Sequence, residues 1–290
     1  MIARKRFHLK LGSKTLALGE RTLVMGVLNV TPDSFSDGGK FLEPEAAVEQ
    51  AFAMAKAGAD LLDVGGESTR PGSREISAAE ELDRILPVLQ ALQGRYEIPI
   101  SVDTRRAAVA ELALRAGAGI INDISGLKHD PRIAEVAAQQ AVPLIVMHMR
   151  GEPRTMQAGP FARDVMKDVL QGLRRSVAIA RKAGVAKSQI ILDPGIGFGK
   201  SFAQNYELLQ KLPQLAKLSY PLMVGTSRKG FLGAALERDG EPAPPEERIW
   251  GTAATVTASV LNGAHIVRVH DVAEMVQVAR VADLLRISRK

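Results

Sequence analysis

The sequence predicts an α/β protein, a (β/α)₈ TIM barrel with a short N-terminal β-hairpin. Eight short aliphatic runs lack the polar alternation of half-exposed strands, so each predicts a parallel strand buried on both faces. The stretches between them repeat apolar residues every three or four positions, which predicts amphipathic helices. Eight such units favour a closed barrel over the alternative, an open doubly wound sheet.

The predicted elements follow one another without a domain boundary. Residues 7–18 predict the hairpin, and the strands lie at 23–29, within 56–66, at 98–103, within 115–125, at 142–148, within 182–195, at 220–225 and within 261–271. Four of these strands follow a helix tail that ends in Gly, which suits a left-handed C-terminal cap. Helices are expected at 44–57, 77–92, 104–116, 131–140, within 163–183, and at 202–212, 228–236, 246–262 and 271–287. The Pro-rich stretch 241–247 reads as a surface loop, so residues 1–290 form one predicted domain.

Composition narrows the classes of function. The chain has 290 residues, of which 46% are hydrophobic, and it contains no cysteine, which excludes disulfides and thiolate chemistry. It also has no apolar run near 18 residues and no leader-like segment, so we expect a soluble cytoplasmic protein without membrane contact. A net charge of +6 suits nucleic acid or an anionic small substrate. Scattered basic residues and few aromatics argue against nucleic acid.

Polar residues stand at the carboxyl end of every predicted strand, where TIM barrels build their active sites. In chain order they are Asn29, Asp63, Asp103, Asn122 with Asp123, His148, Asp193, Lys229 in GTSRKG, and Arg268 with His270. Each has a structural alternative: Asp103 could cap a helix, Asp193 could hold a turn, and His148 could be an interior histidine. Because all eight ends are polar, capping alone is a weak explanation. GIGFGKS at 195–201 lacks the glycine spacing of phosphate and dinucleotide loops, so ATP and NAD sites are rejected.

Seven motifs, in order, resemble those of the dihydropteroate synthases, pterin-binding barrel enzymes of folate biosynthesis that sulfonamides inhibit. They are GVLNVTPDSFSDGG, DVGGESTRPGS, SVDT, INDISG, DPGIGFGK, GTSRKGFLG and HIVRVHD. The resemblance extends from about residue 23 to 285 and is weakest at 1–22 and 237–248. It implies a transferase, usually a homodimer, that joins 6-hydroxymethyl-7,8-dihydropterin diphosphate to p-aminobenzoate, releases pyrophosphate and uses Mg²⁺.

The chemistry of a pterin and the resemblance indicate the same pocket residues. A pterin presents an amino group and a ring N–H side by side, which a carboxylate can accept together, and Asp193 is the first candidate. Asn122 can donate and accept, Asp103 adds a second acceptor, Lys229 can donate to the ring carbonyl and N5, and Met147 can pack on the flat face. The structural alternative is that Asp193 and Lys229 form only an ion pair.

The diphosphate needs positive charge where the leaving group gains negative charge. Arg268 and His270 are two residues apart, so strand geometry places both side chains on one face. Their structural alternative is an ordinary salt bridge at the strand end. Mg²⁺ often takes one or two protein oxygens plus substrate phosphates, so Asn29, on the diphosphate side, could suffice as the metal ligand. Arg70 could contact the diphosphate or the aminobenzoate carboxylate. The predicted catalytic residues are Lys229, Arg268, His270 and Asp103.

The two loops at 31–39 and 68–73 are predicted lids over the aminobenzoate. Phe35 and Pro71 can wall its ring, Thr69 and Ser227 can meet its carboxylate, and Phe198 adds an apolar side. The amine nucleophile is neutral at pH 7, so no strong general base is needed. By resemblance the C–O bond breaks first and leaves a cation on the pterin methylene, from which the lids would exclude water.

Two rival functions fit parts of the sequence. A pterin-binding methyltransferase barrel would share the Asp and Asn pocket, but it would need no diphosphate clamp, so the RVHD and SRK motifs and the two loops argue against it. A basic barrel that binds nucleic acid without catalysis would show salt-dependent affinity for unrelated oligonucleotides.

Overall fold

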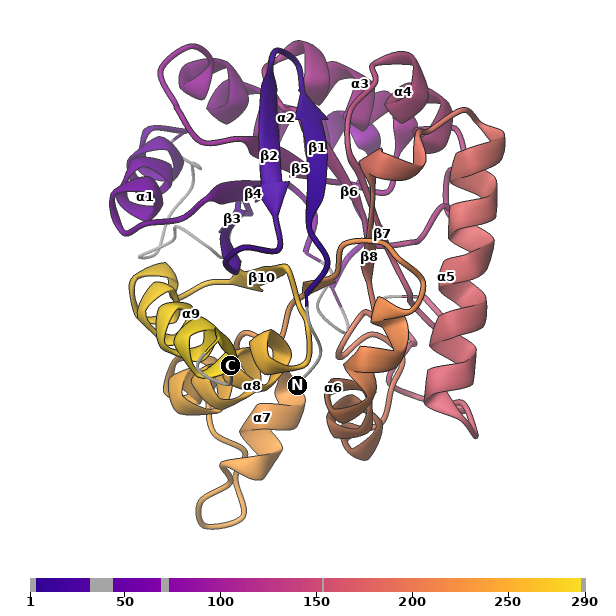
Figure 1. Cartoon of the computed structure of the whole chain (residues 1–290). Helices are drawn as coiled ribbons and strands as arrows, with labels where there is room; N and C mark the ends of the chain where they lie inside the picture. Colours follow the sequence, from indigo (N-terminus) through magenta and orange to yellow (C-terminus); the bar gives the residue numbers. More distant parts are fainter. Residues whose placement is uncertain (1–3, 32–43, 69–72, 153, 288–290) are drawn as a thin grey trace.

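The computed structural model describes residues 4–31, 44–68, 73–152 and 154–287 (Figure 1). In this part of the chain, eight parallel strands form one sheet in the order β8-β7-β6-β5-β4-β3-β10-β9. A parallel bridge between Leu192 and Leu222 joins the two edges, and the sheet closes into a nearly complete barrel. The (β/α)₈ prediction is confirmed, and the open sheet is wrong. The strands are β3 Leu23–Asn29, β4 Leu61–Gly65, β5 Ile100–Asp103, β6 Ile120–Asp123, β7 Leu144–Met147, β8 Ile190–Asp193, β9 Met223–Val224 and β10 Ile266–Val269.

Helices cover the outside of the barrel, as Figure 1 shows. They are α1 Pro44–Lys56, α2 Ala78–Leu92, α3 Ala107–Arg115, α4 Ile133–Gln139, α5 Val165–Lys182, α6 Phe202–Ala216, α7 Gly230–Ala235, α8 Ile249–Leu261 and α9 Val272–Ile287. Every predicted helix is present, and the differences from prediction are confined to the ends.

Three helix ends differ from prediction by three or four residues. Helix α3 starts late because the Ala107 amide donates to Asp130 Oδ2 at 3.0 Å, so a distant carboxylate caps this helix and Asp103 does not. Helix α8 starts late because residues Pro245–Arg248 form a separate 3₁₀ turn at the end of the predicted loop. Helix α6 continues through Pro213, since Leu215 beyond it is fully buried in the core.

The predicted hairpin seals the amino end of the barrel. Strands β1 Phe7–Leu11 and β2 Lys14–Leu18 pair antiparallel. Leu9 and Leu18 are buried against side chains that point into the barrel, namely Met25, Leu61, Ile120, Ile145, Ile191, Met223 and Ile266. Gln189 fixes the hairpin to the barrel, since its side chain accepts from the Lys10 amide at 2.8 Å and donates to the Lys10 carbonyl at 2.9 Å. A site inside the barrel is therefore reached from the carboxyl ends of the strands.

Strand alternation places a polar layer above this apolar floor. Residues two positions beyond the floor side chains share their inward face: Asp63, Asn122, Met147, Asp193 and Arg268. Their strand neighbours Leu62, Ile121, Val146, Leu192 and Val267 belong to the core between strands and helices. Among the described helices, none combines the length and apolar character that crossing a bilayer requires.

Candidate active site

Arg268 lies at the centre of the polar layer, between two carboxylates. Its Nε donates to Asp63 Oδ2 at 2.6 Å and its Nη2 donates to Asp103 Oδ2 at 2.7 Å. Asn122 Nδ2 donates to the same Asp63 oxygen at 2.9 Å. These contacts link β10, β4, β5 and β6 across the barrel interior.

Two carboxylates share one guanidinium in this layer, so full ionisation of both is unfavourable. Burial, with repulsion from Asp63, Glu81 and Asp123, raises the pKa of Asp103 to about 8, and Arg268 opposes that rise. Burial would lower the pKa of Arg268, but Asp63 and Asp103 outweigh it and raise that pKa. The guanidinium therefore keeps its charge, and near neutral pH the Asp103 carboxyl holds its proton.

Two buried acceptors in this layer have no donor among the described residues: Asp63 Oδ1 and Asn122 Oδ1. A buried acceptor left without a donor costs about 1–3 kcal/mol, so these two atoms indicate a missing donor. Neither Asp63 nor Asn122 is among the lining residues of the cavity that opens above this layer, which Arg268 and Asp103 line. The arrangement suits a flat heterocycle that carries several N–H groups. Asp63 is the one residue of this layer that the sequence placed at a strand end without assigning it a role.

Asp193 and Lys229 form the other side of the site. One Asp193 oxygen accepts from the Gly195 amide at 2.7 Å, so the predicted turn role is present. Lys229 Nζ donates to the Ile196 carbonyl and lies 4.6 Å from the centroid of the Phe198 ring. Burial lowers the pKa of Lys229 to about 8, and Asp193 opposes this. Within the described residues no salt bridge joins Lys229 to Asp193, so an ion pair does not account for either side chain.

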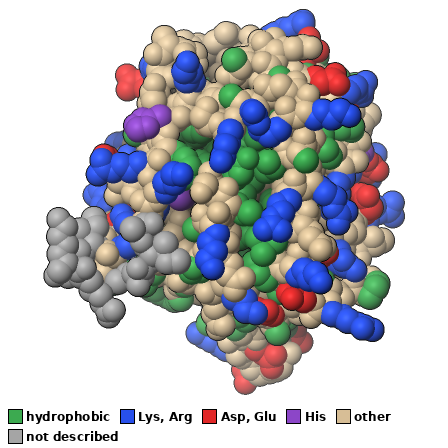
Figure 2. Space-filling view, turned by 45° about the vertical axis from the view of Figure 1, so that its right-hand side comes forward, with side chains coloured by type: hydrophobic (Ala, Val, Ile, Leu, Met, Phe, Trp, Pro, Cys, Tyr) green, Lys and Arg blue, Asp and Glu red, His purple; other side chains and the backbone are tan. Residues whose placement is uncertain are grey.

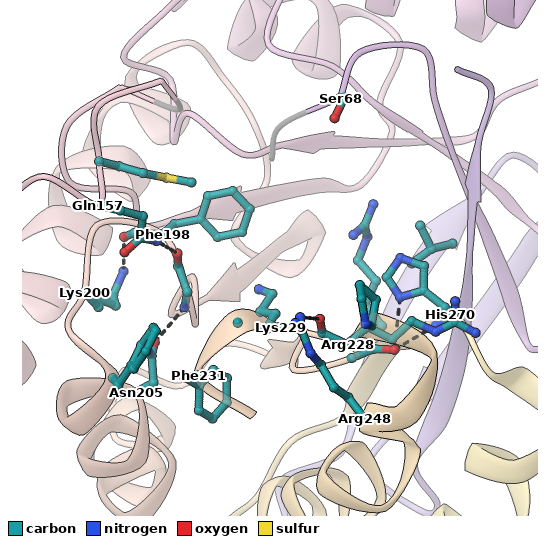
Figure 3. A pocket seen from close by; sticks show the side chains of 18 of the residues that line it. Ser68, Gln157, Phe198, Lys200, Asn205, Arg228, Lys229, Phe231, Arg248 and His270 are labelled. Carbon is teal, nitrogen blue, oxygen red and sulfur yellow. Dashed lines mark hydrogen bonds between the residues drawn. The ribbon is translucent and has the colours of Figure 1, made fainter. Parts of the chain in front are cut away.

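A cavity of about 700 Å³ opens above the polar layer, with Lys229 between its two sides (Figure 3). The predicted residues that line it are Asn29, Asp103, Phe198, Ser227, Lys229, Arg268 and His270. Ser227 Oγ accepts from the His270 amide at 3.1 Å and lies 3.0 Å from His270 Nδ1, so β10 and the β9–α7 loop position each other. Met147 lies beneath, in an apolar cluster against which Phe198 packs. Phe35, Thr69, Arg70 and Pro71, with most of both predicted lids, lie outside the described residues.

The cavity also has lining residues that the sequence did not single out. Arg228 and Arg248 lie on the His270 side in Figure 3, whereas Gln157 and Asn205 lie near Phe198. Arg228 was within the quoted GTSRKG motif, and its guanidinium binds Asp271 with Nε–Oδ2 at 3.1 Å. Gln157 and Asn205 had no signal in the sequence, because each comes from a loop or helix face that the strand-end argument does not reach.

Two of the polar strand-end residues point away from the cavity. Asp123 faces outward and accepts from the Ser125 amide at 2.8 Å and the Leu127 amide at 2.6 Å, which is a turn role. His148 is buried between Lys200 and Asp168, with Nδ1 at 3.1 Å from Lys200 Nζ and Nε2 at 3.4 Å from Asp168 Oδ2. The interior-histidine interpretation therefore holds for His148.

The described residues contain no group of three or more His, Cys, Asp or Glu side chains that could hold a metal ion. A metal in this cavity would therefore need a ligand set with few protein groups. Mg²⁺ accepts such a set, since it keeps several waters and binds substrate phosphates. Asn29 offers an amide oxygen in the same cavity as Arg268 and His270, and its residue type fits that limited role.

The fold and the site define a TIM-barrel enzyme with a buried polar layer and, above it, a cavity lined by cationic side chains, Arg228, Lys229 and Arg248 among them. Residues 25–270 match the pterin-binding enzyme family. The dihydropteroate synthase of Synechocystis sp. is 50% identical over 277 residues, which cover 96% of this chain and 94% of that protein. The chain belongs to the pterin-binding enzymes and, within them, to the dihydropteroate synthases, which are transferases of folate biosynthesis.

Solved structures agree with this assignment. The Yersinia pestis dihydropteroate synthase, in a complex with a sulfonamide drug, is 43% identical and has a TM-score of 0.90, covering 98% of this chain and 100% of that one. The Xanthomonas albilineans enzyme, with 4-aminobenzoic acid, is 40% identical with a TM-score of 0.89, covering 98% of this chain and 99% of that one.

Proposed function

We propose that this barrel joins 6-hydroxymethyl-7,8-dihydropterin diphosphate to p-aminobenzoate to give 7,8-dihydropteroate and pyrophosphate. One observation carries the proposal: the polar layer holds buried acceptors without donors beside cationic side chains that line the cavity. Asp63 Oδ1 and Asn122 Oδ1 are the acceptors, Arg268 is a cation in the same layer, and Lys229 is a second cation that lines the cavity. A molecule with N–H groups at one end and phosphates at the other fits this arrangement.

The pterin ring is held by the polar layer. Asp193 accepts from the adjacent amino and ring N–H groups, and Asn122 offers both a donor and an acceptor. Asp103 adds an acceptor, and Lys229 donates to the ring carbonyl and N5. Met147, which is almost fully buried below the cavity, contacts the flat face. An analogue without these N–H groups would leave buried acceptors unpaired, which gives strong selection for a pterin.

The diphosphate binds beside the cationic side chains that line the cavity. Arg268 supplies a positive charge and the N–H groups that do not donate to Asp63 and Asp103, and His270 adds a ring nitrogen. Both oppose the charge that grows as the C–O bond breaks. Arg70 is a further candidate for a contact with the diphosphate. Asn29 would hold Mg²⁺, which when bound adds charge that neutralises the phosphates. The release of diphosphate is therefore assisted by residues from β3 and β10.

The aminobenzoate binds above the pterin methylene. Its neutral amine forms the C–N bond and gives up a proton, so no nucleophilic side chain is required. Phe198 and Ser227 offer an apolar wall and a hydroxyl, and Phe35, Thr69 and Pro71 are the candidates from the two loops. The Xanthomonas relative binds 4-aminobenzoic acid and the Yersinia relative a sulfonamide, which supports a site for this class of molecule.

The enzyme acts as a homodimer in the cytoplasm. Exposed apolar side chains on two neighbouring helices support the dimer: Trp250 on α8 is 78% exposed, and Val281 and Leu285 on α9 are 58% and 53% exposed. A second copy of the chain would cover them. Light scattering should give twice the 31.1 kDa mass of one chain, and Trp250→Glu should shift it toward one chain.

The experiment for the reaction is pyrophosphate release by purified protein. Release that requires the pterin diphosphate, p-aminobenzoate and Mg²⁺ together is the expected result. Omitting p-aminobenzoate is the matched control. Absence of release, together with tight binding of a methylated tetrahydrofolate, would favour the methyltransferase alternative instead.

A further inference from the structure

A second cavity, of about 580 Å³, lies outside the barrel interior, between the loop after β7 and helix α5. Its polar side chains are Lys128, His148, Arg150, Thr155, Asp168, Arg175 and Ser176. His148 also contacts Lys200, which lines the first cavity, so this pair stands between the two cavities. Among the described residues, none of those assigned to substrate binding lines the second cavity.

The charges around this cavity are unequal. Lys128, Arg150 and Arg175 carry three positive charges, and Asp168 is the only carboxylate among the described lining residues. Burial lowers the pKa of His148 to about 4, so its ring is neutral at pH 7. The hydrogen bond from His148 lowers the pKa of Asp168 to about 2, which keeps that carboxylate ionised. The lining therefore holds two more positive than negative charges at neutral pH.

Only some of these cations form ion pairs within the protein. Arg150 Nη1 lies 3.3 Å from Asp168 Oδ1, and its Nε donates to the Pro160 carbonyl at 3.1 Å. Lys128 donates to the Met149 carbonyl, a neutral acceptor. Arg175 forms no salt bridge with any other described residue. One of the three cations is thus neutralised. The other two, Lys128 and Arg175, are solvent-exposed and form no ion pair with another described residue, so a ligand in the cavity can contact them.

The same face is basic beyond the cavity. Figure 2 brings the α5 side forward and shows Lys and Arg side chains around a strip of hydrophobic side chains. Residues 128–217 contain 14 Lys and Arg against 7 Asp and Glu, so this segment carries more than the whole net charge of +6. An anion that approaches this face is attracted before it reaches the cavity.

Part of the cavity lining is apolar, and helix α5 lies close against the cavity. Met149, Met156, Pro160 and Ile179 form the walls. Gly172 allows α5 to approach His148, because a Cβ at this position would collide with the His148 ring. A ligand with an anionic group at the cations could therefore rest an apolar or flat part on the walls.

We propose that this cavity is a second ligand site, for a small dianion of the phosphate or diphosphate class. Two unneutralised charges match a dianion, and Arg side chains form paired hydrogen bonds with phosphate oxygens. The phosphate chemistry could come from inorganic phosphate or pyrophosphate, or from a phosphate ester with a ring that contacts the methionine walls.

The test uses methyl NMR of the full chain labelled at its nine methionines. Met149 lines the second cavity and not the first, whereas Met147 lies under the substrate site in the same apolar cluster. A Met149 shift without a Met147 shift therefore reports on the second cavity. We titrate sodium pyrophosphate in one arm and adenosine monophosphate in the other. A saturable Met149 shift in either arm is expected, and a tighter response to the nucleotide would identify a phosphate ester as the class bound.

The variant is Lys128→Gln with Arg175→Gln, and its matched control is Lys167→Gln with Arg174→Gln, two exposed α5 cations outside the cavity lining. The first pair should weaken binding by about tenfold or more, because it removes charge-assisted contacts, while the control keeps affinity within about twofold. Absence of a saturable Met149 shift would overturn the proposal. Equal loss in both variants would also overturn it, because it would indicate only diffuse attraction to a basic face.

Discussion

Lys200 offers the sharpest test of how the site is held in place. Its side chain is 1% exposed, and its Nζ lies 2.9 Å from the Phe198 carbonyl, 3.1 Å from the His148 carbonyl and 3.1 Å from His148 Nδ1. As an ammonium it can donate to all three, which leaves the His148 ring proton on Nε2, toward Asp168. Lys200 therefore fixes the loop whose Ile196 carbonyl and Phe198 ring contact Lys229.

Lys200→Met keeps much of the side-chain volume and removes the donors. Leaving these acceptors unpaired costs about 1–3 kcal/mol each, but loss of a buried amine offsets part of this, so we expect about 2–4 kcal/mol of destabilisation in total. Because Lys229 then loses its fixed carbonyl and ring, pterin affinity should fall by about tenfold or more, a loss of about 1.4 kcal/mol.

The pH dependence gives a second readout. Burial lowers the pKa of Lys200 to about 7 from an ordinary value of 10.5. The unfolded chain binds the Lys200 proton more tightly than the folded chain does. Below pH 7 the buried charge therefore lowers the free energy of unfolding, and this penalty disappears as pH rises from about 7 to 10.5. The stability difference between wild type and Lys200→Met should therefore grow by up to about 2 kcal/mol from pH 7 to pH 9.

Denaturant unfolding at several pH values measures stability, and calorimetry measures pterin affinity. Lys217→Met is the matched control, because that lysine is exposed at the end of α6. If both variants behave alike in stability and in pterin binding, Lys200 does not anchor the loop and the reasoning is refuted.

Three further predictions concern the substrate site. Lys229→Ala should weaken pterin binding by about tenfold or more, measured by calorimetry, and unchanged affinity would remove Lys229 from the pocket. His270→Ala should lower kcat more than it raises the KM for p-aminobenzoate, and equal turnover would exclude a role at the leaving group. Asp63→Asn removes a negative charge that raises the pKa of Asp103, so the Asp103 carboxyl, followed by ¹³C NMR, should titrate below the wild-type value of about 8. An unmoved midpoint would contradict that coupling.

The sequence predicted the barrel because its hydrophobic pattern is strong and regular. Helix boundaries were less predictable where the capping group is distant: α3 begins at Ala107 because Asp130, 23 residues away, accepts from its amide. Strand length was also less predictable where pairing is limited. The 220–225 run contributes only Met223–Val224 to the sheet, since its neighbour β8 joins it through a single bridge.

Strand alternation predicts which side chains at the strand ends point into the site. Asn122 and Met147 point inward while the adjacent Asp123 and His148 point outward, and a period of two residues from the floor side chains Ile120 and Ile145 accounts for both pairs. Polar character alone cannot make this distinction, because all four residues lie at strand ends.

Strand alternation does not predict which long side chain crosses the barrel interior. Arg268 spans to Asp63 and Asp103 because β10, β3, β4 and β5 are consecutive in the closed sheet, an order that local pattern does not specify. The same closure that brings the arginine to two carboxylates makes their ionisation interdependent. Asp63 is thus a functional candidate through its effect on Arg268 and Asp103, and a substitution there should alter the charge of the pocket before it alters its shape.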